Sequence, residues 1–321
     1  AAATLDARRG SVNFNRAGTW LDSRNVAAIS LLDGGWAGTT LDMRNVRLVG
    51  DLLRVTKLEI PGRDSSVYCN SSIVGTTLHV TDILELLPLL GTAYIGDPGN
   101  VLALGGGNVG KFPAGVNIAL GVDSSNRASA LIGRTSPHQL VRSALAVAGG
   151  GGTLTAYLSQ LQLGYNAGHA YAVHAVFDAS AMDSCLFDVT SLRLGTDRPV
   201  PLPTDIVNAT LRLPVGAALV GEALIGGSGA GQALLGLSNT VTTISGSLTL
   251  NPTALVEIKT GADSKGLDVT GTFVDAGGSV AVTFLETPAA AATNWALRVA
   301  GNAVTTLGAM YGSGRLTVSG L

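Results

Sequence analysis

Three aspartates in FDASAMDSCLFD, namely Asp178, Asp183 and Asp188, are the residues of this sequence best suited to chemistry. Clustered carboxylates act as general acid and base in polysaccharide hydrolases and lyases, and carboxylates also bind Ca²⁺. The three aspartates are evenly spaced at an odd interval, and an odd spacing within one strand places side chains on alternate faces. A shared surface would need intervening turns, so the sequence favours aspartates at corners or turns over a catalytic cluster.

The histidines and glycine-rich segments are the next candidates for a site. His169 and His174 in GHAYAVH are separated by the same odd interval, again on opposite faces of a strand, and no further metal ligand lies near them in the sequence. GGGNVGKF (105–112) and GGSGAG (226–231) lack the Gly-x-x-x-x-Gly-Lys-Ser/Thr pattern of a phosphate loop. The other histidines are His79 and His138. We therefore predict histidines that are either on the surface or hydrogen-bonded polar residues, glycine-rich loops, and neither metal nor cofactor.

The two cysteines and the first residues of the sequence indicate whether the protein is exported from the cell. Cys69 and Cys185 are the only cysteines, and they are either two free buried thiols or one disulfide. A disulfide would require Cα atoms within about 7 Å of each other. The sequence begins AAATLDA, and this alanine-rich start fits a chain that follows a signal-peptidase cleavage site. We expect a secreted, extracellular or cell-surface protein after removal of a signal peptide.

The composition argues against two classes of partner. Only 13% of residues are charged, against roughly 25% in average globular chains, and the net charge is −2. This balance provides no electrostatic surface for nucleic acid. The most apolar stretch, 214–237, is interrupted by Glu222, Gln232 and many glycines. These interruptions would weaken a helix, so we predict no transmembrane segment.

The elements that must position any site are strands, because apolar residues alternate with a period of two. Four phrases share a core of the form x-V-T-x: LLRVTKLEI (52–60), TLHVTDILEL (77–86), LFDVTSLRLG (186–195) and GLDVTGTFV (266–274). A second phrase is short, apolar and ends in glycine: VLALG (101–105), NIALG (117–121), SALIG (129–133), ALVG (218–221), ALIG (223–226) and ALLG (233–236). We interpret each of these as a strand that glycine ends through its freedom to adopt positive φ.

Imperfect repetition at short, irregular spacings predicts an all-β solenoid, a parallel β-helix with irregular rungs and corner loops. Leu-Asp-x-Arg occurs at Leu5, Leu21 and Leu41. Stacked copies would place Asp6, Asp22 and Asp42 in one column, and Arg8, Arg24 and Arg44 in another. We divide the chain into N-terminal rungs (1–198), a proline-rich loop or seam (199–214) and C-terminal rungs (215–321).

The final third carries a family resemblance. SLTLNPTALVEIKTG (247–261), followed by SKGLDVTGTFVDAGGSVAVTFLE (264–286), resembles the C-terminal rungs of autotransporter passengers and related secreted bacterial β-helix proteins. The resemblance implies a right-handed parallel β-helix at or outside the cell surface. It implies neither a particular adhesin nor a particular enzyme.

These features together favour a non-enzymatic exported structural protein that assembles with copies of itself into a filament or sheath. A surface poor in charge gives little repulsion between copies, and a β-helix has two ends with open strand edges. The predicted assembly residues are Ala1, Ala2, Ala3 and Thr4 at one end, and Leu316, Thr317, Val318, Ser319, Gly320 and Leu321 at the other. The alternatives are an adhesin that binds cell-surface glycans, and a polysaccharide lyase or hydrolase.

Overall fold

The computed structural model consists of β-strands, turns and connecting segments in the part of the chain that it describes. Backbone and side chains are described for residues 115, 117–133, 150–166, 173–197, 206–261, 265–285 and 295–302. Outside these ranges the structure describes the backbone of the strands named below. The predicted all-β class is confirmed for this part of the chain.

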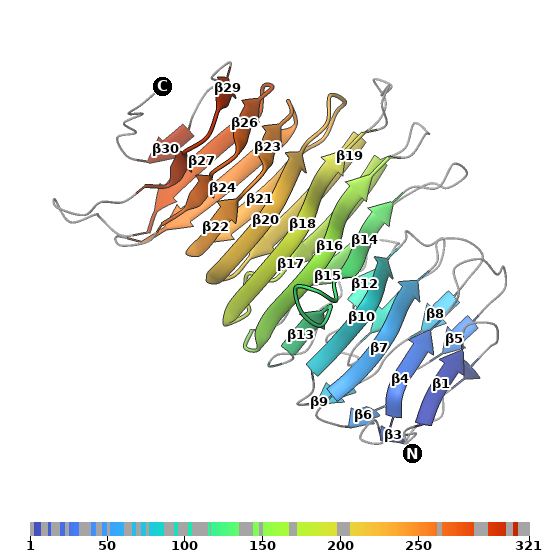
Figure 1. The fold of residues 1–321 in the computed structure, drawn as a ribbon. Helices are drawn as coiled ribbons and strands as arrows, with labels where there is room; N and C mark the ends of the chain where they lie inside the picture. The colour runs from blue at the N-terminus through green and yellow to red at the C-terminus, as the bar shows by residue number, and fades with distance from the viewer. Residues whose placement is uncertain are drawn as a thin grey trace.

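The largest element is a sheet of fifteen strands, and every pairing within it is parallel. Its main path runs in chain order along an elongated body, from blue to red in Figure 1. The path consists of β1 (Ala3–Ala7), β4 (Val26–Leu31), β7 (Leu52–Ile60), β10 (Thr77–Leu86), β13 (Asn117–Leu120), β16 (Thr153–Tyr165), β18 (Ser184–Thr196), β20 (Gly216–Ile225), β22 (Thr240–Ile244), β25 (Leu267–Val269) and β28 (Leu297–Val299). Beside this path lie β14 (Ala128–Arg134), β23 (Ser247–Leu250), β26 (Thr272–Asp275) and β29 (Ala303–Thr305).

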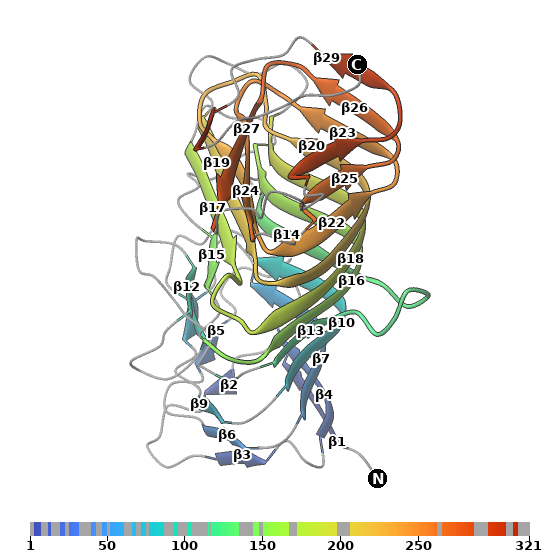
Figure 2. The same cartoon turned by 90° about the vertical axis from the view of Figure 1, so that its left-hand side faces the viewer.

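A second parallel sheet of seven strands faces the first, as Figure 2 shows. It consists of β15 (Ala144–Val147), β17 (Ala172–Asp178), β19 (Ile206–Leu213), β21 (Ala233–Ser238), β24 (Ala254–Thr260), β27 (Ser279–Phe284) and β30 (Tyr311–Ser313). From β16 onward the chain passes back and forth between the two large sheets, and after β21 it forms two strands of the fifteen-stranded sheet, such as β22 and β23, before each strand of the seven-stranded sheet. It therefore returns to each sheet next to the strand that it laid down before.

Three small sheets complete the described strands. Two are parallel and three-stranded: β2 (Val12–Asn13), β5 (Thr40–Asp42) and β8 (Ser66–Tyr68), and β3 (Trp20–Asp22), β6 (Arg47–Val49) and β9 (Ser72–Val74). The third pairs β11 (Ala93–Ile95) with β12 (Leu102–Leu104), and this pairing is antiparallel.

One hydrophobic core lies between the two large sheets. Burial alternates along β19 and β24 with a period of two, so every second side chain points inward. Phe187 and Leu154 enter the core from the fifteen-stranded sheet, and Leu211 and Val256 enter it from the seven-stranded sheet. Each side chain of this kind contributes about 1.5–3 kcal/mol when it is fully buried.

The x-V-T-x phrases mark a bend that recurs in the fifteen-stranded sheet. In β18 the inward Val189 is followed by two residues that are not buried, Thr190 and Ser191, and then by the buried Leu192. The same break separates β25 from β26, where buried Val269 is followed by exposed Thr270. The phrase therefore supplies an inward valine followed by an outward residue at the bend.

Glycines stack at this bend in the C-terminal part of the sheet. Gly221, Gly246, Gly271 and Gly301 follow one another, and each would clash with the carbonyl group of the residue stacked before it if it carried a Cβ atom. That residue is Thr190 for Gly221 and the preceding glycine for the other three. Glycine is required here because one backbone approaches another closely.

A second column of glycines confirms part of the prediction about glycine-terminated phrases. Gly133, Gly164, Gly195 and Gly226 are equally spaced in the sequence, with φ of 70°, 69°, 59° and 82°. The register places them side by side where the strands of the fifteen-stranded sheet turn. Gly121 and Gly226 directly follow β13 and β20 and end them as predicted. Gly133, Gly164 and Gly195 are the penultimate residues of their strands, and Gly221 and Gly236 lie further inside β20 and β21.

The predicted column of Asp6, Asp22 and Asp42 is wrong, and Arg8, Arg24 and Arg44 lie outside the described residues. Leu5 pairs with Ile29 in β4, Leu21 with Leu48 in β6, and Leu41 with Val12 in β2, so the three copies belong to three different sheets. Paired positions in the two large sheets are further apart in the sequence than successive copies of this phrase, for example Ala233 with Ala254 and Ala172 with Ile206. Copies as close together as these cannot meet, because the chain visits another sheet before it returns.

The segment predicted as a proline-rich loop or seam is partly a strand. Its second half, Ile206–Leu213, is β19, and residues 198–205 lie outside the described residues. Pairing in the fifteen-stranded sheet continues from β18 to β20 across this segment. The division of the chain into two stacked parts stays a prediction.

Candidate assembly surfaces

Each large sheet ends in strands that have one partner among the described residues. In the fifteen-stranded sheet β1 pairs with β4, β28 with β25, and β29 with β26. These end strands lie at opposite ends of the elongated body in Figure 1. A parallel end strand exposes backbone N–H and C=O groups that another strand can pair with.

The end strands of the fifteen-stranded sheet carry opposite charges. Asp6 lies in β1, and Arg298 lies in β28. Arg298 donates from Nε to Asp268 Oδ1 over 2.9 Å, makes a second bond to Asp268 Oδ2, and lies 4.9 Å above the ring of Trp295. About half of the Arg298 side chain is exposed, whereas Asp268 is buried, so β28 offers a positive group to anything that pairs with it.

The ion pair predicts how stability depends on pH. The hydrogen bonds from Arg298 lower the pKa of Asp268 below its ordinary value, against the opposing effect of burial. The pair therefore stabilises the fold at neutral pH, and this contribution is lost as the pH falls from about 4 through the pKa of the folded state. Melting temperature measured against pH should fall more steeply below about pH 4 in the wild type than in Asp268→Asn. The control is Asp183→Asn, a substitution at an exposed residue of a turn, which should keep the wild-type profile. A wild-type profile in Asp268→Asn would contradict the prediction.

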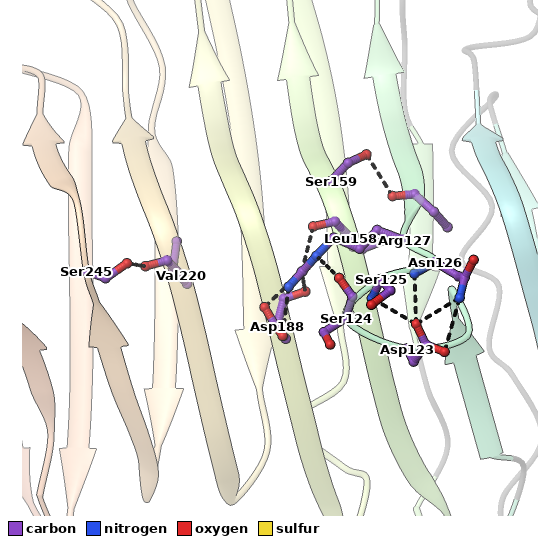
Figure 3. A network of polar contacts seen from close by, with 11 residues as sticks. Asp123, Ser124, Ser125, Asn126, Arg127, Leu158, Ser159, Asp188, Val220 and Ser245 are labelled. Carbon is purple, nitrogen blue, oxygen red and sulfur yellow. Dashed lines mark hydrogen bonds and ion pairs between the residues drawn. The ribbon is translucent and has the colours of Figure 1, made fainter.

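A polar cluster around Arg127 fixes a projecting loop to the fifteen-stranded sheet (Figure 3). The Arg127 guanidinium donates to both carboxylate oxygens of Asp188, over 2.8 and 3.0 Å. It also donates to the backbone oxygens of Leu158 and Ser124, so it crosses β16 to reach β18. Within the loop, backbone hydrogen bonds from Ser125 and Asn126 lower the pKa of Asp123. These contacts are internal to the protein and give the cluster an architectural role.

The structure does not bring the three predicted aspartates together. Asp178 ends β17 and accepts hydrogen bonds from the backbone and hydroxyl of Ser180, and Asp183 is an exposed residue of the turn before β18. Both positions fit the predicted corners or turns. Asp188 lies in the middle of β18, on the other large sheet, where its partner is Arg127.

The other candidates for metal or ligand binding are dispersed. His174 is exposed in β17 and lies 3.4 Å from the Asn208 side chain, whereas His138 and His169 lie outside the described residues. His79 lies in β10, and only its backbone is described. GGSGAG forms the connection after β20, as predicted, and GGGNVGKF lies outside the described residues. Within the described ranges no group of three His, Cys, Asp or Glu residues is placed to hold a metal ion.

Cys185 is a free, buried thiol in β18. Its Sγ donates to the backbone oxygen of Pro214 over 3.6 Å, and burial raises the pKa of the thiol to about 11. A thiol with so high a pKa reacts slowly near neutral pH. For Cys185 this agrees with the predicted alternative of two free buried thiols, and Cys69 lies outside the described residues.

The predicted assembly residues are described only in part. Ala3 and Thr4 lie in β1, where they pair with Val26 and Ala28 at the edge of the fifteen-stranded sheet. Ala1, Ala2 and the segment 316–321 lie outside the described residues. The role of all these residues in assembly stays a prediction.

Sequence analysis missed the ion pair between Asp268 and Arg298, although the sequence contains a signal for it. GLDVTG (266–271) and ALRVAG (296–301) are two copies of the pattern Leu-x-Val-x-Gly. Their strands pair in register, which places Asp268 beside Arg298. The contact between Arg127 and Asp188 has no comparable signal, because Arg127 lies in a loop and reaches across an intervening strand.

Comparisons with known proteins gave no match, so the function is inferred from the architecture and from the geometry of the sites. No family model matches the chain, and neither the curated proteins nor the solved structures gave a match. In the described part of the chain, no helix has the length and apolar character needed to cross a membrane. Residues 216–225 and 233–238 of the apolar stretch form β20 and β21.

Proposed function

We propose that the chain is a right-handed parallel β-helix, as the sequence and its resemblance predict. The alternation of the chain between two facing parallel sheets supports this proposal. The number of residues between paired positions also supports it in two places. This interval is the same for β16 with β18 as for β15 with β17. It is also the same for β20 with β22 as for β19 with β21. Connections between parallel strands of one sheet are right-handed in about 98% of cases.

We further propose that the protein is a non-enzymatic, exported structural protein that assembles end to end. The observation that carries this proposal is the pair of end strands, β1 and β28, which lie at the two ends of one parallel sheet and each have one partner strand among the described residues. A second copy can add its β1 to β28 in the direction that the sheet already follows. Such a head-to-tail contact does not close on itself, and its repetition gives a filament.

Charge and surface composition support the same arrangement. Head-to-tail addition would bring Asp6 of one copy toward Arg298 of the next, and opposite charges in neighbouring strands attract. The outer face of the fifteen-stranded sheet also carries exposed apolar side chains, including Leu186, Leu219 and Val241.

Replacing Asp6 with lysine tests the end-to-end contact. We expect Asp6→Lys to slow filament growth several-fold, because it places a positive charge opposite Arg298, and added salt should reduce the difference because it screens charges. The matched control is Asp42→Lys, because Asp42 occurs in the same Leu-Asp phrase but in β5, which has a partner strand on each side. Light scattering and electron microscopy over a range of concentrations provide the measurement.

Deletion of Leu316–Leu321 tests the predicted terminal strand separately. We expect the shortened protein to keep its melting temperature and to lose assembly. Filaments of normal length from this deletion would exclude the role of these residues. Single elongated particles of the full chain at every concentration would exclude end-to-end assembly altogether.

A further inference from the structure

A polar hollow lies on the outer face of the seven-stranded sheet, near the C-terminal ends of β19, β21 and β24 and away from the two end strands of that sheet, β15 and β30. It is lined by Ser180, Arg212, Gly236, Ser238, Glu257 and Lys259, together with Leu213 and Leu237, whose side chains belong to the core. Its open volume is about 370 Å³, part of which is open to solvent. About 100 Å³ of this volume is cavity space, which is below the roughly 300–1,000 Å³ found for small-molecule sites, so the hollow suits one small ring that stays partly in solvent.

The hollow exists because of Gly236. The register places Arg212, Gly236 and Glu257 at equivalent positions of β19, β21 and β24. Since the middle strand has no side chain there, the flanking side chains face each other across a gap. Arg212 Nη2 and Glu257 Oε2 are 3.5 Å apart, which exceeds the roughly 2.7–2.9 Å typical of charge-assisted hydrogen bonds. About a third of each side chain is exposed, so both are accessible to a ligand.

The lining offers two cations and several hydroxyl groups. Arg212 and Lys259 face one lining carboxylate, Glu257, and Asp178 lies beside Arg212 in the register. Lys259 makes no ion pair with the residues that the structure describes. A guanidinium binds a carboxylate through two parallel hydrogen bonds. Glu257 can accept hydrogen bonds from ligand hydroxyls, and the Ser238 hydroxyl can donate or accept. The Ser180 hydroxyl donates to Asp178, so it can accept from a ligand. A singly charged carboxylate on a polyhydroxyl ring matches both features.

We propose that this hollow binds one uronic acid residue, that is, a sugar ring bearing a carboxylate. The carboxylate lies on Arg212 and Lys259, and the ring hydroxyls face Glu257 and Ser238. The site is on the side of the body, so it remains accessible whether or not copies assemble through their ends. In an assembled filament the same site recurs once in every copy, and an acidic polysaccharide can contact many copies together.

Titration with methyl α-D-glucuronide, followed by NMR of the folded protein, tests the proposal. We expect saturable shifts of the Gly236 amide and its neighbours, and much weaker shifts with methyl α-D-glucoside, which lacks the carboxylate. Arg212→Ala should weaken binding by about tenfold or more, because it removes the group that forms charge-assisted hydrogen bonds with the ligand carboxylate. Lys259→Met, a change at an exposed position, should weaken binding without altering the melting temperature.

Two further variants make the test specific. Gly236→Ala adds a Cβ atom 3.1 Å from Arg212 Cγ and should block the hollow while leaving the fold intact. Arg193→Ala removes an exposed arginine of β18 on the other large sheet and should bind the glucuronide like the wild type. Equal binding of glucuronide and glucoside, unchanged binding in Arg212→Ala, or no saturable shift would each overturn the proposal. None of these results depends on filament formation, so the two proposals fail separately.

Discussion

Phe187→Ala is expected to lower the free energy of unfolding by about 3–5 kcal/mol, the range for removal of a buried aromatic side chain. Phe187 is completely buried in the middle of β18. Its register partners are Ala156 in β16 and Ala218 in β20, which are both small. The substitution would leave three alanines in a row, and neither neighbour can fill the cavity. Urea denaturation followed by circular dichroism provides the measurement.

The neighbouring position provides the control for this substitution. Leu186 precedes Phe187 on the same strand but points outward, and 37% of it is exposed. Leu186→Ala should change stability by no more than about 0.5 kcal/mol, as is usual for surface substitutions. Equal losses in the two variants would mean that β18 does not present Phe187 to the core. Phe187→Leu should retain much of the stability, because it replaces most of the lost volume.

Gly271→Ala is the second substitution with a large expected effect, a loss of about 1–3 kcal/mol through overpacking. A Cβ atom at Gly271 would lie 2.6 Å from the carbonyl carbon of Gly246 and 2.8 Å from the backbone oxygen of Ser245. Real Cβ atoms essentially never come within 3.0 Å of such neighbours. The obstacle is backbone that is held in a parallel sheet, so it cannot rotate away as a side chain could. Thermal and urea denaturation of the variant would measure the loss.

A glycine outside the column serves as the matched control. Gly150 is exposed, and a Cβ atom there would lie 3.7 Å from the backbone oxygen of Ala181, an ordinary contact distance. Gly150→Ala should be neutral or slightly stabilising, because alanine restricts the unfolded chain more than glycine does. If Gly271→Ala proved as harmless as Gly150→Ala, the close stacking of glycines at the bend would be wrong.

Local pattern was sufficient to predict the strands. The x-V-T-x phrases at 52–60 and 77–86 coincide with β7 and β10, and those at 186–195 and 266–274 fall on β18 and on the pair β25 and β26. This success has a physical cause, since an inward valine and an outward threonine satisfy both the period of two and the bend. Asp178 and Asp183 were likewise placed at a turn because their spacing excludes one face of one strand.

Pairing between strands was harder to predict, because it depends on how far the chain travels before it returns. The Leu-Asp-x-Arg copies are similar in sequence, yet their strands belong to different sheets. The constant interval between Gly133, Gly164, Gly195 and Gly226 is the better guide to register, because these glycines have the same turn conformation. The hollow at Gly236 has no signature of its own in the sequence, since Arg212 and Glu257 meet only through the register of three strands.

The loop held by Arg127 makes the protein a scaffold for presenting foreign peptides. The chain leaves the fifteen-stranded sheet after Leu120, beside Ala156, and re-enters it at Ala128, beside Leu158. The excursion from 121 to 127 therefore spans a single position of β16, and Figure 2 shows it projecting from the body. A graft between Ser124 and Ser125 would begin and end at adjacent points of a rigid platform. If copies join end to end, each grafted epitope would recur at a fixed interval along the polymer, which is the arrangement that a multivalent vaccine or an immobilised enzyme array requires.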